Sequence, residues 1–245
     1  MKKQEAPNSF DHGEYEAVLK QYVDEEGKVD YAGLKSSNAL EPYLADLART
    51  DPLAMPKAER LAFMINAYNA YTLKLILDNY PIPSIKHITP IRLKGRSLYI
   101  PKLNSPFAYK IANVGGKALS LGYIEHQSIR KAFAEPRIHF ALVCAAKGCP
   151  RLRREAYTGA RLSEQLDDQA YIFLRNPEKN LIPCDPGTVL LSPIFSWFRY
   201  DFGRNKRERL AFIARYFDGP VREKLEAGHY HIAYHDYDWS LNDAG

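Results

Sequence analysis

A long apolar helix constrains the fold of this 245-residue chain more than any other feature of its sequence. The segment 57–79 contains neither proline nor glycine, and the following Tyr80-Pro81 ends it because proline interrupts helical structure. Apolar residues lie on all sides of the segment, which is typical of a buried helix rather than a surface helix. We therefore expect one buried central helix with the remaining elements packed around it.

Asn66 and Asn69 interrupt the apolar surface of that helix and, three residues apart, project in neighbouring directions. An unpaired buried amide costs about 1–3 kcal/mol, so both side chains should have hydrogen-bond partners. A structural network explains such a pair more readily than catalysis, although a positioning or oxyanion-binding role stays open. We expect both to reach the cysteine-bearing segment or the helix that carries Glu125.

The segment 138–143 is short, β-branched and almost entirely apolar, which predicts a buried central strand. Two of the three cysteines follow it, at positions 144 and 149. Because proline is favoured at the first helical position, Pro150 predicts a helix start with Cys149 at or near its N-cap, where amide groups favour a thiolate. Four basic residues would add to that effect: Lys147, Arg151, Arg153 and Arg154.

Other roles for the cysteines stay open. Cys144 would share a strand face with apolar residues, so it could fill the core. Cys144 and Cys149 could also form a disulfide if their Cα atoms lie within about 7 Å. We interpret Cys184, between prolines, as structural.

The segment 121–133 predicts a helix capped by Ser120, with Glu125 near the middle of its apolar face and His126 at the edge. A glutamate in that position needs a partner. A salt bridge to Arg130 or Arg137 is one explanation, and a carboxylate that orients a histidine or acts as acid and base is the other. We expect Glu125 to be buried and bonded to His126, His139 or an arginine.

The other predicted helices and strands alternate irregularly along the chain. Helices are predicted at 15–22, 40–47, 162–174, 207–217 and 220–226, a hairpin at 107–119, a strand or hairpin at 180–191, and a strand at 231–234. This order predicts a single α+β (mixed α/β) domain over residues 10–242, with a central mixed or antiparallel sheet packed with helices around the buried helix. Residues 1–9 are expected to be an N-terminal tail.

The composition of the chain limits the classes of molecule that it is expected to bind. The net charge of +5 is mild and no block of lysine and arginine is present, so we expect no nucleic-acid partner. No apolar run reaches the roughly 18 residues of a membrane span. The basic start of the chain lacks an apolar core, so we expect no signal peptide, although a mature secreted chain would look the same. A small-molecule or peptide ligand is the expected partner, without a cofactor.

Several phrases resemble the domain of unknown function 547 family: INAYNA at 65–70, SLGYIEH at 120–126, PRIHFAL at 136–142, GCPRL at 148–152 and YDWSLN at 237–242. The resemblance extends over residues 10–242 and implies membership without implying a reaction. The family occurs in bacterial envelope-type proteins and in plant proteins that also contain coiled-coil segments. The resemblance therefore implies a periplasmic or envelope location, with a cytoplasmic one as the alternative. Val143 stands where relatives tend to have asparagine, which argues against a role for that amide here.

These residues suggest a cysteine-dependent acyl-transfer enzyme, hydrolase or transferase, acting on a small anionic or peptide-like substrate. Cys149 would be the nucleophile and His126 or His139 the base, oriented by Glu125, Asn66 or Asn69. One alternative is a non-catalytic envelope module in which Cys144 and the basic residues around Cys149 bind an anionic ligand. Another is a metal site of His126, His139, Cys144 and Cys149, whose spacings match no standard ligand pair.

Overall fold

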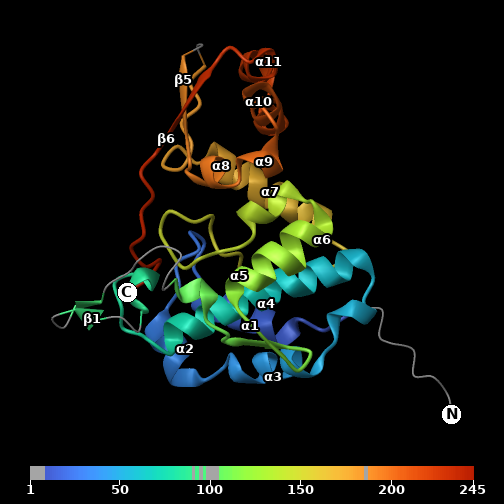
Figure 1. Ribbon diagram of the computed structural model, residues 1–245, viewed down its shortest axis with the longest axis vertical. Coiled ribbons are helices and arrows are strands. Elements are labelled where there is room, and N and C mark those ends of the chain that lie inside the picture. The colour runs from blue at the N-terminus through green and yellow to red at the C-terminus, as the bar shows by residue number, and fades with distance from the viewer. Residues whose placement is uncertain (1–8, 90–91, 94–95, 98–104, 185–186) are drawn as a thin grey trace.

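The computed structural model describes residues 9–89, 92–93, 96–97, 105–184 and 187–245, and most of this chain is helical (Figure 1). Helix accounts for 52% of the residues in this structure, and strand for 9%. Residues 1–8 of the expected tail lie outside the described residues. Among the described residues, no helix is long and apolar enough to cross a membrane.

Helix α4, Lys57–Leu77, is the central element, as the sequence predicts. Its 21 residues are buried on nearly every side, including Asn66 and Asn69, which are 1% and 3% exposed. It lies in the larger of two hydrophobic clusters. The predicted buried helix is therefore confirmed.

Three shorter helices and a hairpin pack around α4. The helices are α1 (Gly13–Tyr22), α2 (Tyr31–Ser37) and α3 (Glu41–Arg49). The predicted hairpin consists of β3 (Ala112–Val114) and β4 (Lys117–Leu119), paired antiparallel. Its turn uses Gly115 and Gly116 at φ 57° and 75°, a region that favours glycine, and their N–H groups donate to carbonyls at the end of α3. Short elements complete this part: 3-10 turns η1 (Pro52–Ala54), η2 (Ile85–His87) and η3 (Pro106–Ala108), and strands β1 (Arg92–Leu93) and β2 (Arg96–Ser97).

A helical run over 121–133, predicted from the sequence, contains an unusual middle section. It comprises α5 (Leu121–Tyr123), the π-helix η4 (Ile124–Arg130) and α6 (Lys131–Phe133), and Ser120 caps it by accepting a hydrogen bond from the N–H of Tyr123. π-Helical turns are rare and often occur at functional sites. Glu125 and His126 both lie in this π section.

The predicted central strand at 138–143 is wrong, and so is the central mixed or antiparallel sheet of the expected α+β fold, because the described residues form no central sheet. Pro136–Phe140 forms a 3-10 helix, η5, and the described strands form only two-stranded pairs: β1–β2, β3–β4 and β5–β6. The physical reason lies in Asn69, whose side chain bonds to the backbone of Ala141 and Val143. These are groups that a strand would offer to a neighbouring strand, so the apolar segment is satisfied without a sheet.

The second hydrophobic cluster forms the upper part of the molecule in Figure 1. Its elements are α7 (Leu162–Arg175), β5 (Thr188–Leu191), α8 (Ile194–Trp197), α9 (Arg199–Phe202), α10 (Lys206–Ala214), α11 (Gly219–Ala227) and β6 (His231–Tyr234), with β5 and β6 parallel. Ile138 packs into the first cluster and Phe140 into the second. His139 therefore lies where the two clusters meet.

The C-terminal segment descends from β6 to the lower part of the molecule (Figure 1). Its Tyr237 hydroxyl contacts both Cys144 and Cys149. The N–H groups of Lys147 and Gly148 donate to the carbonyls of Ser240 and Asp238 at 2.8 Å each, and the N–H of Asn242 donates to Ala145 at 3.2 Å. A Cβ on Gly148 would lie 3.0 Å from both the Asp238 carbonyl and the Tyr237 ring, so glycine permits this close approach. The segment holds the cysteine loop in one conformation.

Candidate active site

The loop between Cys144 and Cys149 brings the two thiols together. Ala145 adopts φ 60°, and the N–H of Cys149 donates to the Ala146 carbonyl at 3.0 Å, which closes a tight turn. The N–H of Cys144 donates to Cys149 Sγ at 3.0 Å. The Tyr237 hydroxyl lies 3.1 Å from Cys149 Sγ and 3.3 Å from Cys144 Sγ. Both cysteines are free thiols.

The helix expected to begin at Pro150 is absent, because residues 151–161 contain no helix and α7 begins only at Leu162. Three of the four basic residues are also engaged elsewhere, Arg151 through a hydrogen bond to the Glu25 carbonyl. Arg153 pairs with Asp168 and Glu155, and Arg154 pairs with Glu25. The predicted helix dipole is therefore the wrong explanation for an acidic Cys149.

Local hydrogen bonds supply that acidity instead. Burial alone would raise the pKa of the Cys149 thiol, but hydrogen bonds from Cys144, Tyr237 and the backbone outweigh it and lower the pKa to about 7. The hydrogen bond to Cys149, together with burial, raises the pKa of Cys144 well above its ordinary value. Cys149 is thus the thiol that ionises near neutral pH.

A cavity of about 170 Å³ adjoins this pair. Its polar lining consists of Tyr68, Glu125, His139, Cys144, Cys149 and Tyr237. Aromatic side chains form much of the remaining wall: Phe107, Trp197, Phe198 and Trp239. The sequence-predicted Glu125, His139 and Cys149 therefore share one partly open, largely apolar cavity.

Glu125 is mostly buried, in line with the prediction, although 15% of its side chain is exposed. Burial raises the pKa of its carboxyl to about 7, against the opposing influence of Arg130. The expected bonded partner is present only loosely: its closest ion pair is with His126 Nδ1 at 3.9 Å, and among the described residues it makes no hydrogen bond. The carboxyl group is therefore available to a molecule in the cavity.

His139, rather than His126, lies in the cavity. Its Nε2 is 2.7 Å from Asp201 Oδ2, and its ring stacks on Phe198 with centroids 4.0 Å apart. Arg130 donates to the same carboxylate through Nε at 2.7 Å and Nη2 at 2.9 Å. These hydrogen bonds outweigh partial burial and hold the pKa of Asp201 well below its usual range. The ring of His139 is thereby fixed in position.

His126 is placed outside this arrangement. Its side chain is 48% exposed, and Arg130 Nη1 lies 3.1 Å from its Nδ1. Within the described chain, neither His126 nor His139 forms a hydrogen bond to Cys149; Tyr237 occupies that role. A direct Cys–His pair is therefore not part of this structure.

Asn66 and Asn69 hold the segment that carries the cysteines. Asn69 donates to the Ala141 carbonyl and accepts from the Val143 N–H, at 2.9 Å each. Asn66 makes the same paired contact with Tyr157, at 2.7 and 2.9 Å. Asn69 reaches the cysteine-bearing segment as predicted, and Asn66 holds the loop that follows it. Both side chains therefore hold backbone segments on either side of the cysteine loop.

Replacing Asn69 with alanine should lower the free energy of unfolding by about 2–6 kcal/mol, because a buried N–H and a buried C=O lose their partner and each costs about 1–3 kcal/mol. Denaturant unfolding measures the change. Thr72→Val is the matched control on the same helix, since the Thr72 hydroxyl donates to the Tyr68 carbonyl one turn away and to no other described residue. A loss in Asn69→Ala no larger than in the control would contradict the bracing role.

Replacing Tyr237 with phenylalanine should raise the pKa of Cys149, because a thiolate there loses one hydrogen-bond donor. A hydrogen bond to a charged group contributes about 1.5 kcal/mol or more, so alkylation by iodoacetamide at neutral pH should slow by roughly fivefold. Tyr234→Phe, on the exposed part of β6, is the control and should leave the rate unchanged. Equal rates in both variants would show that Tyr237 does not stabilise the thiolate.

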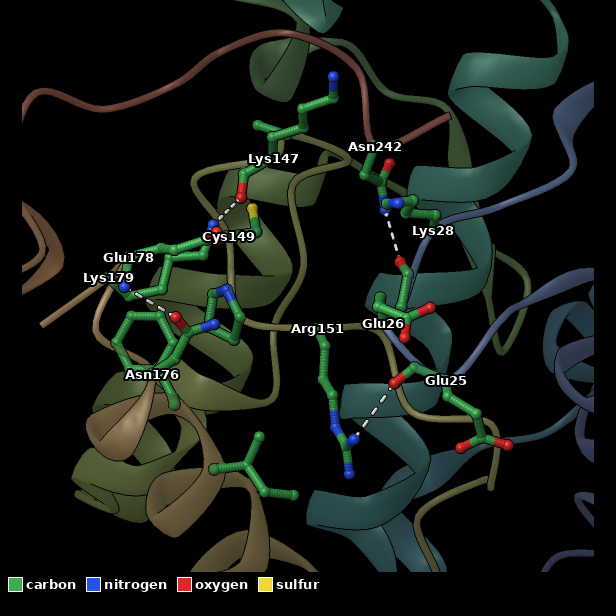
Figure 2. Close-up of a pocket in the computed structure, with 15 residues that line it drawn as sticks. Glu25, Glu26, Lys28, Lys147, Cys149, Arg151, Asn176, Glu178, Lys179 and Asn242 are labelled. Carbon is green, nitrogen blue, oxygen red and sulfur yellow. Dashed lines mark hydrogen bonds between the residues drawn. The ribbon is translucent and has the colours of Figure 1, made fainter. Parts of the chain in front are cut away.

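A second, larger cavity of about 500 Å³ also has Cys149 and Pro150 in its wall. Its lining includes Lys147 and Arg151 from the predicted ligand-binding set (Figure 2). Arg151 donates to the Glu25 carbonyl at 3.2 Å, and Asn242 donates to Gly27 at 3.1 Å on the same side. Charged side chains of both signs line this cavity: Glu25, Glu26, Lys28, Lys147, Arg151, Glu178 and Lys179.

Sequence reasoning missed Tyr237 and Asp201 as members of the site, and it named Arg130 only as a possible partner of Glu125, whereas Arg130 pairs with Asp201. Tyr237 opens the YDWSLN phrase, so its membership in that phrase was a usable signal. Asp201 lies within an aromatic run that reads as core, and only its contact with His139 distinguishes it. Among the residues with described positions, no group of three or more His, Cys, Asp and Glu is arranged to hold a metal ion.

Comparison with known proteins gives one family. No curated protein and no solved structure matches the chain. The family described as "Protein of unknown function, DUF547" matches residues 52–174, half of the chain, from the start of η1 to the last turn of α7. That span contains Asn66, Asn69, Glu125, His139 and Cys149, whereas Asp201 and Tyr237 lie beyond it. The chain therefore belongs to the DUF547 family.

Proposed function

We propose that this protein is a cysteine-dependent acyl-transfer enzyme, a hydrolase or transferase, with Cys149 as its nucleophile. One observation supports the proposal above all others. A single cavity is lined by Cys149, whose pKa is lowered to about 7, and by Glu125, whose pKa is raised to about 7. Groups matched in this way can supply a nucleophile and a proton donor at the same pH.

The reaction follows from these two groups. The Cys149 thiolate attacks the carbonyl carbon of an ester, thioester or amide, and a carbon–sulfur bond forms. The bond to the leaving group breaks, and protonated Glu125 supplies the proton that the leaving group needs. Water or an acceptor nucleophile then attacks the acyl-cysteine, and the Glu125 carboxylate takes the proton from that attacking group. The carbon–sulfur bond breaks, which restores the Cys149 thiolate.

His139 is a second acid–base group of the cavity. Its Nε2 faces the Asp201 carboxylate, so the neutral ring carries its hydrogen there and leaves Nδ1 as a proton acceptor. Burial lowers the pKa of His139, which keeps the ring neutral near pH about 7. The Tyr68 hydroxyl remains neutral because burial raises its pKa well above the ordinary value. This hydroxyl makes no hydrogen bond to the rest of the described chain.

The larger cavity supports the anionic or peptide-like character of the substrate. Its lining carries four cationic side chains, while the carboxylate of Glu25 is already paired with Arg154. Lys28 and Lys147 are exposed and form no ion pair among the described residues. Glu26 and Glu178, also exposed, supply negative charge at the same cavity, which suits an acyl compound with a carboxylate and an ammonium group. A periplasmic or envelope location is part of the same proposal.

The test uses two nitrophenyl esters, one with a neutral acetyl group and one with an anionic succinyl group. Mass spectrometry of the digested protein should find the acyl group on the peptide containing Cys149, and Cys149→Ser should take up none. Succinyl transfer should be faster than acetyl transfer. Acylation that is equal in the wild type and in Cys149→Ser would contradict the proposal and favour a non-catalytic binding module.

A charge variant tests the substrate class separately. Lys28→Gln combined with Lys147→Gln should slow succinyl transfer and leave acetyl transfer unchanged, because only the anionic ester uses these charges. Lys131→Gln, an exposed lysine on α6 outside both cavities, is the control. Equal losses with both esters would contradict the anionic preference while leaving Cys149 as the nucleophile.

A further inference from the structure

Cys144 and Cys149 are closer than the proposed reaction requires. Both sulfur atoms contact the same Tyr237 oxygen, at 3.3 and 3.1 Å, and the N–H of Cys144 donates to Cys149 Sγ at 3.0 Å. Acyl transfer needs one thiol. The second thiol beside the nucleophile is thus a feature that the proposed function leaves unexplained.

We propose that Cys144 is the resolving thiol of Cys149 and that a peroxide converts the pair into a reversible disulfide, which removes the nucleophile. The inference rests on the proposed function only for the loss of acyl transfer; the disulfide itself is a separate property of the chain. From the sequence, a Cys144–Cys149 disulfide is an alternative to a reactive Cys149 thiol. The structure places both thiols in a state from which each reaction can start.

The loop geometry favours closure of this bond. The turn at Ala145 and the hydrogen bond from Cys149 N–H to Ala146 fold the four intervening residues back on themselves. Three backbone hydrogen bonds join this loop to the C-terminal segment: Lys147 and Gly148 donate to that segment, and Asn242 of the segment donates to Ala145. Because the thiols are already adjacent in the folded chain, joining them requires little further ordering of the loop.

The chemistry balances with a peroxide as the oxidant. The Cys149 thiolate attacks the O–O bond of hydrogen peroxide, giving a sulfenic acid on Cys149 and hydroxide, which takes a proton to become water. Cys144 then attacks the Cys149 sulfur; the sulfur–sulfur bond forms, the sulfenic oxygen leaves, and with the thiol proton it becomes a second water. The pair loses two electrons and an external dithiol returns them by exchange.

The roles of the two thiols are not interchangeable. The sulfur that is ionised at neutral pH reacts with peroxide first, and Cys149 is that sulfur because its pKa is lowered to about 7. Cys144, whose pKa is raised, remains protonated until the sulfenic acid forms beside it. Cys184 is exposed and lies apart in the chain segment before β5, so it is removed for the test.

The experiment treats reduced Cys184→Ser protein with hydrogen peroxide near neutral pH and follows the intact mass. The expected product has lost two hydrogens, yields one cross-linked peptide containing Cys144 and Cys149, and no longer reacts with iodoacetamide. Dithiothreitol should restore both the mass and the reactivity. The same protein with Cys144→Ser should instead gain oxygen on Cys149 and, with excess peroxide, become resistant to dithiothreitol.

Two results would overturn the inference. One is oxygen addition to Cys149 in the Cys184→Ser background without a cross-link, at the rate seen when Cys144 is also replaced. The other is a peroxide product that dithiothreitol does not reverse. Because these readouts use mass alone, a cross-link in a protein that never accepts an acyl group would leave this inference standing and refute the proposed function. Acyl transfer without a cross-link would refute only the disulfide.

Discussion

Glu125→Gln should make the protein more stable above neutral pH while it blocks acyl transfer. Burial raises the pKa of the Glu125 carboxyl from 4.5 to about 7, so between these values the folded protein holds a proton that the unfolded chain has released. The free energy of unfolding therefore falls as pH rises through that window. At 1.36 kcal/mol for each pH unit, the loss amounts to about 3 kcal/mol above pH about 7.

Glutamine does not titrate, so the variant should escape that loss. Denaturant unfolding of the two proteins should give similar stabilities near pH about 4 and a difference of up to about 3 kcal/mol in favour of Glu125→Gln near pH about 8. Glu223→Gln, an exposed position on α11, is the matched control and should follow the wild type at both values. A Glu125→Gln profile parallel to that of the wild type would show that Glu125 is not held protonated.

The same variant should lose catalytic turnover. A glutamine cannot donate a proton to the leaving group or take one from water, so both halves of the proposed reaction slow. General acid–base groups contribute typically 10²–10⁴-fold, and a rate loss of about that size is expected with the acyl esters. Glu223→Gln should again behave as the wild type. A stabilised variant with full activity would separate the buried carboxyl from catalysis.

Sequence periodicity was sufficient wherever the determinants are local. The segment 57–79 predicts α4 because a long, mainly apolar run with no proline or glycine has few other structures available to it. The 121–133 pattern places Glu125 on the buried face, and the structure confirms that placement. In both cases the spacing of residues along one helix carries the information.

Contacts between distant parts of the chain explain the errors. The 138–143 segment has the composition of a strand, but Asn69, about seventy residues earlier, takes up its backbone hydrogen bonds. Pro150 resembles a helix start, but the residues after it bond to α4 and α7 instead of forming a helix. Asn66 of α4 donates to the Tyr157 carbonyl, and Arg153 donates to Asp168 of α7. No local sequence pattern reveals these partners. Neither outcome is encoded within the segment concerned.

The chemistry of the site was predictable in its residue types but not in its pairings. Cys149, Glu125 and His139 do meet in one cavity. The partner of the thiol is Tyr237, 88 residues away, and the partner of the histidine is Asp201, 62 residues away. A tyrosine in a C-terminal phrase and an aspartate in an aromatic run have many structural explanations, so only the folded chain identifies their roles.

The central claim is that Cys149 is the ionised, reactive thiol and Cys144 the quiet one. It rests on the hydrogen bonds that converge on Cys149 Sγ, from the Cys144 N–H at 3.0 Å and the Tyr237 hydroxyl at 3.1 Å. These donors lower the pKa of Cys149 to about 7 even though the thiol is buried, whereas the pKa of Cys144 is raised. An ordinary thiol ionises near pH about 8.5, so Cys149 should be alkylated well below that value.

The most direct measurement is the rate of iodoacetamide alkylation of the reduced protein between pH about 5 and 9, resolved by residue with mass spectrometry. The wild type and Cys184→Ser should share a phase with its midpoint near pH 7 that modifies Cys149. Cys149→Ser should lack that phase, and Cys144→Ser should retain alkylation of Cys149. Loss of the phase in Cys144→Ser alone, or no reaction of either thiol below pH about 8, would contradict the assignment of Cys149 as the nucleophile.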